Sequence, residues 1–193
     1  MMTSLLLLGV LAAEPEFKKV DTVDGVLIES RPVAGSGVVE LKLTTGTDKT
    51  VKSLCEAAFG TGKFDPEEPD LKSRIIVSES ENERVTYEQI SPPVVANRDY
   101  AVRAKRVLNE DGSCRMSFEA ANELAPKQPD GWVRIAKLKG AWIFEPEAEG
   151  KTKVTYLIHS DPGGAIPAFM VEGSRKKIAL QWVKKILGRG ATK

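Results

Sequence analysis

The most regular feature of the sequence is a set of six runs in which apolar and polar residues alternate. The clearest run is 98–108, where Tyr100, Val102 and Ala104 share one parity while Arg103 and Lys105 share the other. Side chains alternate between the two faces of a strand, so this pattern predicts a strand with one apolar face. Turn residues separate the runs, which favours an antiparallel sheet. The six runs are 73–81, 83–91, 98–108, 113–124, 131–147 and 152–160.

The chain before these runs predicts two more strands and a short helix. The strands are 25–33 and 37–46, which are rich in β-branched and aliphatic residues. Over 48–60 the apolar residues recur at helical spacing, with Asp48 as the candidate N-cap and Gly60 as the end. Segment 62–70 is too acidic and rich in proline for either element, so we expect a loop there.

A long amphipathic helix is predicted over 165–187. Its apolar residues recur every three or four positions, and basic residues lie on the opposite side. The element order is therefore two strands, a helix, six strands and a helix. We expect an α+β fold in which a curved antiparallel sheet grips the C-terminal helix. The apolar positions of the helix are Val171, Ile178, Ala179, Trp182, Val183, Ile186 and Leu187.

The joint between the last strand and this helix is the stretch HSDPGGAIPAFM, residues 159–170. Two glycines, Gly163 and Gly164, stand between Pro162 and Pro167. Glycine permits backbone angles that other residues avoid, whereas proline fixes φ. The stretch is predicted to be a shaped loop with Gly163 and Gly164 as a hinge.

Composition indicates one globular domain of 193 residues with a formal net charge of +1. The charge is unevenly placed: residues 1–165 carry a net charge of −5 and residues 166–193 carry +6. The basic residues of the final helix thus stand out from a mildly acidic body. Nucleic-acid binding is disfavoured, because the strands show no interleaving of basic and aromatic residues.

The N-terminus begins with an apolar run over 5–13, which is too short to span a bilayer. It fits the hydrophobic region of a signal peptide, and Val10 and Ala12 supply small residues at a cleavage site. Residues 1–13 are therefore predicted to be a signal peptide, which implies a periplasmic or secreted protein. The alternatives are an uncleaved apolar helix and a cytoplasmic location.

The metal and redox chemistry of the chain is limited by its few cysteines and histidines, which are Cys55, Cys114 and His159. One cysteine falls in a predicted helix and the other in a predicted strand, and the sequence does not show whether they meet. We expect two buried free thiols. No ligand spacing for structural zinc is present, so no metal site is predicted.

Two stretches carry a resemblance to a known family. SPPVVANRDYAVRAKRV (91–107) and the opening of 159–170 resemble landmarks of START (steroidogenic acute regulatory protein-related lipid transfer) domains, in particular the phosphatidylcholine-transfer-like members. With GWVRIAKLKGAWIFEP between them, the resemblance covers a domain of about residues 20–190. It implies a helix-grip fold with a tunnel for one lipid, gated by the C-terminal helix, and no cofactor.

The resemblance and the residue types together suggest a ligand site. Arg98 suits a lipid phosphate or ester, although Arg98 and Asp99 could instead tie a loop to the strand. Several sterol-binding relatives have a buried arginine at the position of Ala104, and Arg103 could take that role here. Strand aromatics, Phe144 among them, could line the tunnel or simply form core. The predicted lipid-binding residues are Arg98, Asp99, Tyr100, Arg103, Tyr87, Phe118, Trp142, Tyr156, Phe169, Met170 and Trp182.

The expected partners are one phospholipid or acyl lipid and, transiently, a membrane surface. Lys176, Lys177, Lys184 and Lys185 are predicted to contact that membrane. We expect a non-enzymatic monomer. One alternative is an enzyme resembling polyketide cyclases and aromatases, with His159 or Asp99 as the acid–base group. Another is a protein-binding module whose tunnel is filled by its own aromatics.

Overall fold

The computed structural model describes residues 14–68, 70–93, 95–164, 166 and 168–190, with side chains of the last helix from Gly173 onward. A ten-stranded sheet dominates it, in the order β1-β2-β3-β10-β9-β7-β6-β5-β4, with the short β8 beside β6. The strands are β1 (Lys18–Val23), β2 (Val26–Arg31), β3 (Glu40–Thr47), β4 (Leu71–Glu79), β5 (Glu83–Ile90), β6 (Arg98–Leu108), β7 (Cys114–Ala120), β8 (Val133–Arg134), β9 (Lys137–Pro146) and β10 (Thr152–Asp161).

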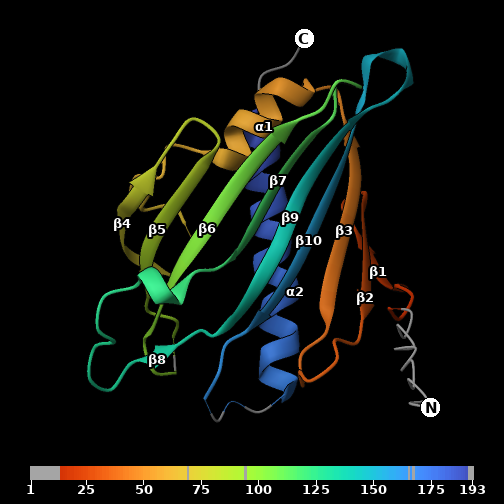
Figure 1. Ribbon diagram of the computed structural model, residues 1–193. Helices are drawn as coiled ribbons and strands as arrows, with labels where there is room; N and C mark the ends of the chain where they lie inside the picture. Colours follow the sequence, from red (N-terminus) through yellow and green to blue (C-terminus); the bar gives the residue numbers. More distant parts are fainter. Residues whose placement is uncertain (1–13, 69, 94, 165, 167, 191–193) are drawn as a thin grey trace, which may run out of the picture.

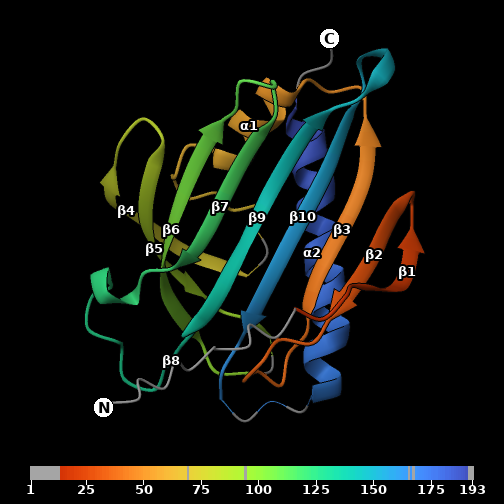
Figure 2. The same ribbon diagram turned by 45° about the vertical axis from the view of Figure 1, so that its right-hand side comes forward.

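Two helices complete the fold, α1 (Val51–Phe59) and α2 (Ala168–Arg189). Helix α2 runs along one face of the sheet, and α1 packs near its C-terminal end (Figures 1 and 2). Every pair of neighbouring strands on the main path is antiparallel, and only β8 pairs in parallel with β6. The predicted α+β helix-grip fold is confirmed. The sheet is not closed into a barrel.

The main core lies between the sheet and the two helices. Phe144 of β9 is fully buried, as are Leu54 of α1 and Val183 of α2. Leu54 and Val183 lie on the apolar faces of their helices, and Phe144 lies on the apolar face of its strand. The sequence pattern thus predicted which way these side chains point. Burial of such side chains supplies most of the folding free energy of a domain.

Several element boundaries differ from the prediction. Strand β1 was not predicted, because this edge strand is almost wholly exposed and shows no apolar alternation. Helix α1 is capped by Thr50, whose hydroxyl accepts from the Ser53 N–H at 3.2 Å, and not by Asp48. The run 131–147 divides into β8 and β9, and the run 113–124 ends as a short 3₁₀ turn over Asn122–Leu124.

The expectation of free thiols is wrong, because Cys55 and Cys114 form a disulfide. It joins α1 to β7 across 59 residues of sequence, and both cysteines are buried. The burial was predicted correctly. The pairing was not, since it depends on how α1 packs on the sheet, and no spacing in the sequence encodes that.

Loss of this disulfide should lower the free energy of unfolding by about 2–4 kcal/mol, because the cross-link restricts a long loop of the unfolded chain. Urea unfolding of the oxidised protein, the reduced protein and the Cys55→Ala/Cys114→Ala variant measures this. We expect the reduced protein and the variant to unfold at similar, lower urea concentrations. Equal midpoints for all three proteins would contradict the prediction.

Residues 1–13, predicted as a signal peptide, lie outside the described residues. Within the described part of the chain, neither helix combines the length and the apolar character that crossing a bilayer requires.

Candidate functional site

A cavity of about 1400 Å³ lies between the sheet and helix α2. Its wall is built from the side chains of one parity on each strand, exemplified by Tyr100, Val102 and Ala104 of β6. The loop between α1 and β4 and the loop between β10 and α2 supply its rim. The apolar and aromatic members of the lining include Met116, Phe118, Leu138, Trp142, Tyr156, Ile158, Ile178 and Trp182.

Aromatic residues on β7, β9 and β10 form one wall of the cavity. Trp142 and Tyr156 are opposite each other in the β9–β10 register, and their rings stack with centroids 4.0 Å apart. Phe118 lies 6.3 Å from Tyr156. Burial raises the pKa of Tyr156, so its hydroxyl remains protonated and polar. Phe144 stacks behind Trp142 and does not line the cavity, so it belongs to the core.

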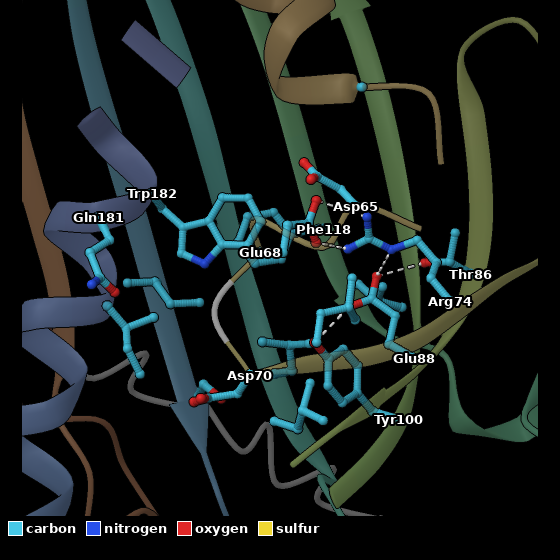
Figure 3. Close-up of a pocket in the computed structure, with 18 of the residues that line it drawn as sticks. Asp65, Glu68, Asp70, Arg74, Thr86, Glu88, Tyr100, Phe118, Gln181 and Trp182 are labelled. Atoms are coloured by element: carbon cyan, nitrogen blue, oxygen red, sulfur yellow. Dashed lines mark hydrogen bonds and ion pairs between the residues drawn. The ribbon is translucent and has the colours of Figure 1, made fainter. Parts of the chain in front are cut away.

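A buried charged cluster lines the cavity, formed by residues of β4, β5 and β6 together with Glu68 of the loop before β4 (Figure 3). Arg74 donates from Nε to Glu88 at 2.8 Å and from Nη1 to Glu68 at 2.9 Å. Tyr100 donates its hydroxyl to Glu88 at 2.7 Å, and Thr86 donates to the same carboxylate at 3.0 Å. Despite the cost of burial, the two carboxylates raise the pKa of Arg74, and burial raises that of Tyr100. These groups could bind the polar part of a ligand.

A second polar position is Arg98, which is 2% exposed and lines the cavity beside the loop after β10. Its Nε donates to the carbonyl of Pro162 at 3.4 Å, and Nη1 donates to the carbonyl of Ala96. No carboxylate among the described residues pairs with it, and burial lowers its pKa. The contact with Pro162 shows that Arg98 ties this loop to β6. Its remaining guanidinium nitrogen, Nη2, has no hydrogen-bond partner within the described ranges.

Three predicted lipid contacts lie on the outer face of the sheet instead. Asp99 is fully buried there, accepting from the Tyr87 hydroxyl at 2.9 Å and from Arg134 Nε at 3.2 Å. Arg103 is directed to the same side, where it pairs with Glu83 and Glu123 at 3.6 and 3.3 Å. The predictions for Tyr87, Asp99 and Arg103 are therefore wrong as cavity contacts. The strand period of two places them opposite Tyr100 and Ala104.

The other predicted contacts line the cavity. These are Arg98, Tyr100, Phe118, Trp142, Tyr156 and Trp182. The side chains of Phe169 and Met170 lie outside the described residues. Sequence reasoning missed Arg74 and Glu88, because charged residues in strands usually face solvent. It also missed Glu68, which lies in the loop before β4. For Glu88, the parity shared with Thr86 on β5 was the available signal.

The basic residues of α2 are not a uniform solvent-facing surface. Lys184 pairs with Asp24 at 2.6 Å, and Lys185 pairs with Asp65 at 2.8 Å with only 12% of its side chain exposed. Lys177 is exposed at the cavity rim, while Lys176 is half-buried. Lys184 and Lys185 are thus engaged in ion pairs within the protein, and contact of the four lysines with a membrane stays a prediction.

His159 does not face the cavity. It lies buried on the outer side of β10, with Nε2 3.1 Å from the Ser36 hydroxyl, which donates to Asp161 at 3.4 Å. Asp161 also accepts from the Gly163 N–H at 3.1 Å. Burial, and then the positive charges of Arg175 and Lys139, lower the pKa of His159.

The lowered pKa of His159 should make the protein less stable in mild acid. Between the folded-state pKa and the ordinary value of about 6.5, the unfolded chain binds more protons, so the free energy of unfolding falls as pH falls. We expect a slope of at most about 1.4 kcal/mol per pH unit in this window. Urea unfolding from pH 7.5 to 5 measures it, and His159→Gln should flatten the slope. If the free energy of unfolding of that variant kept the same pH dependence, titratable groups other than His159 would be responsible for it.

The glycines of the predicted hinge both adopt left-handed backbone angles, with φ of +63° at Gly163 and +72° at Gly164. Such angles favour glycine over any residue with a side chain. Gly163 also lies against Val133, which a side-chain carbon would approach to 3.2 Å. The loop shape therefore requires these glycines, and hinge motion stays a prediction.

A curved antiparallel sheet that grips a C-terminal helix around an apolar cavity defines a helix-grip protein with room for an internal ligand. Residues 69–190, more than half of the chain, match the family model of the START domain. The chain therefore belongs to the START domain family.

Comparisons with individual proteins agree with this assignment. An uncharacterised protein of Pseudomonas aeruginosa is 27% identical over 166 residues, covering 82% of this chain and 79% of its own. The rat (Rattus norvegicus) phosphatidylcholine transfer protein is 21% identical over 156 residues, covering 79% and 73%. Among solved structures, a STAR-related lipid transfer protein fragment from Xanthomonas axonopodis superposes with a TM-score of 0.77 at 23% identity, covering 89% of this chain and 97% of that one.

Proposed function

We propose that the protein binds one phospholipid or acyl lipid in the cavity and transfers it between membranes, with helix α2 as the lid. The observation that carries this proposal is the largely apolar cavity of about 1400 Å³. Pockets for drug-sized ligands are usually about 300–1000 Å³, so this volume suits a longer acyl ligand. Membership of the START family and the named lipid transfer proteins among its relatives support a lipid ligand.

The two polar positions would orient the lipid. Arg98 keeps Nη2 available at the cavity wall, and a guanidinium suits a phosphate or ester oxygen. Tyr100 and Glu88 form the second polar position on the same wall, at the next inward positions of β6 and β5. The acyl part would then lie along Phe118, Trp142 and Trp182.

The structure gives less support to the two alternatives from the sequence, a cyclase-type enzyme and a protein-binding module. The acid–base candidates of a cyclase-type enzyme, His159 and Asp99, both lie on the outer side of the sheet. A protein-binding module was expected to fill the tunnel with its own aromatics, yet the cavity remains beside Phe118, Trp142 and Tyr156. Absence of enzymatic activity stays a prediction.

We also propose that the protein is exported to the periplasm or secreted. Disulfides form and persist mainly in oxidising compartments, so the Cys55–Cys114 bond supports this location. Fractionation of the native cell, followed by mass measurement of the mature N-terminus, tests the location and the cleavage of residues 1–13 together. Recovery of the reduced, full-length protein from the cytosol would contradict it.

Transfer itself is tested with vesicles that carry a pyrene-labelled phospholipid and unlabelled acceptor vesicles. We expect the protein to accelerate transfer, and Arg98→Leu to slow it by about tenfold through loss of the headgroup anchor. The matched control is Arg103→Leu, which removes an arginine from the same strand on the outer face and should leave transfer unchanged. No acceleration by the wild-type protein, together with no bound lipid, would reject the function.

A further inference from the structure

The loop between α1 and β4 lies across the rim of the cavity and contacts the C-terminal part of α2. Its residues from Gly60 to Glu68 line the cavity. Gly60 and Gly62 hold positive φ angles of +59° and +68°, so the beginning of the loop uses backbone states suited to glycine. Phe64, in the middle of the loop, is 47% exposed. The loop thus combines an exposed aromatic ring with a position at the cavity entrance.

One carboxylate holds this loop to the helix. Asp65 Oδ2 lies 2.8 Å from Lys185 Nζ, and the same oxygen pairs with Arg189. Asp65 Oδ1 accepts from the Glu67 N–H at 2.9 Å, which fixes the carboxylate within the loop. The ion pair with Lys185, and then the hydrogen bond from the Glu67 N–H, lower the pKa of Asp65, so it stays ionised in mild acid.

The ion pair between Asp65 and Lys185 is also connected to the wall of the cavity. Lys185 Nζ lies 5.4 Å from the centroid of the Trp182 ring, in the range of a cation–π contact, and Trp182 lines the cavity. A change in the partner of Lys185 would therefore alter the surroundings of Trp182 in the cavity as well as the position of the loop.

We propose that an anionic membrane surface opens the cavity entrance by replacing Asp65 as the partner of Lys185 and Arg189. This inference rests on the proposed function. Two cations share one carboxylate, so the cluster has an excess of positive charge that attracts anionic headgroups. Arg189 is the more accessible partner, with 39% of its side chain exposed against 12% for Lys185, so headgroups reach Arg189 first. A membrane offers several phosphates at once, which favours the exchange where the surface is anionic.

Release of Asp65 frees the loop at the membrane. Phe64 then enters the headgroup region beside Lys63, because aromatic rings and lysines favour that interface. The rim of the cavity moves away from α2 where the lipid must pass. Opening would thus occur at the membrane and not in solution, which limits loss of the lipid to water.

The test uses Asp65→Asn, with Asp24→Asn as the matched control. Asp24 is an exposed residue between β1 and β2 that pairs with Lys184 of α2 and does not line the cavity, so its variant makes the same substitution and breaks an ion pair to the same helix without touching the latch. Transfer of a pyrene-labelled phospholipid is measured between phosphatidylcholine vesicles with and without phosphatidylserine. Native mass spectrometry measures the lipid content of each variant, and thermal unfolding confirms its fold.

We expect phosphatidylserine to accelerate transfer by the wild-type protein and by Asp24→Asn. Asp65→Asn should transfer about fivefold faster on pure phosphatidylcholine and respond less to phosphatidylserine, with unchanged lipid content. Equal rates for Asp65→Asn and the wild type on both vesicles would overturn the latch. If Asp65→Asn transferred lipid faster but phosphatidylserine had no effect on the wild type, the latch would stand and the anionic membrane would be rejected as its trigger. Neither result rejects the proposed function, which fails only if the wild type carries no lipid.

Discussion

Replacement of Ala104 by tryptophan should empty the cavity of lipid. Ala104 faces the cavity from the middle of β6, beside Phe118 of β7. An indole at this position would occupy space that the ligand needs, so we expect the lipid content to fall by about tenfold or more. Lipid extraction followed by quantitative mass spectrometry of the purified variant measures this.

The adjacent residue offers a matched control. Lys105 lies on the same strand but points to the outer, exposed side, so Lys105→Trp adds the same ring without entering the cavity. It should retain the lipid content of the wild type. Over-packing can cost about 1–3 kcal/mol, so thermal unfolding is compared for both variants. A folded Ala104→Trp protein with full lipid content would show that the ligand lies elsewhere.

Replacement of Arg74 by leucine should be the most destabilising change in the wall of the cavity. Glu68 and Glu88 are each 7% exposed and depend on Arg74 for charge compensation. Removing one partner of a buried ionic cluster costs about 3–5 kcal/mol, because the remaining charges are desolvated and unpaired. Urea unfolding measures the free energy of unfolding of the variant.

Two comparisons make this prediction specific. The triple variant Glu68→Gln/Arg74→Leu/Glu88→Gln removes the two carboxylates with the arginine and should recover part of the loss. Arg103→Leu removes an arginine from exposed ion pairs on the outer face and should cost no more than about 1 kcal/mol. If Arg74→Leu were as mild as Arg103→Leu, the buried cluster would not contribute to stability as described.

The alternation in β6 predicted the direction of its side chains correctly, and this explains both the success and the errors at the site. Tyr100, Val102 and Ala104 face the cavity as their parity requires. Asp99 and Arg103 were assigned to the ligand against that parity, on the basis of resemblance, and the structure places them outside. The period of the strand was the stronger signal.

Tyr87 shows a limit of such patterns, because the sheet is covered on both faces near β5 and β6. Val85 and Ala101 are buried in a small second core with Ala121 on the outer side, so an apolar outer residue there is not a cavity residue. Conversely, the inner face of β5 carries the polar Thr86 and Glu88. Apolar character therefore indicated the wrong face of β5.

The disulfide and the Asp65 contact depend on how distant segments pack. Cys55 reaches Cys114 only because α1 lies over β7, and Asp65 reaches Lys185 only because the α1–β4 loop crosses the end of α2. The sequence predicts each element with its apolar face. It does not specify which loop meets which helix end.

The central claim is that the cavity holds one lipid. Native mass spectrometry of the protein purified without detergent tests it most directly, with identification of any bound species after extraction. The account predicts an added mass corresponding to one phospholipid or acyl lipid per chain, lost in Ala104→Trp and kept in Lys105→Trp. A protein that carries no lipid, and takes up none from vesicles, would contradict it.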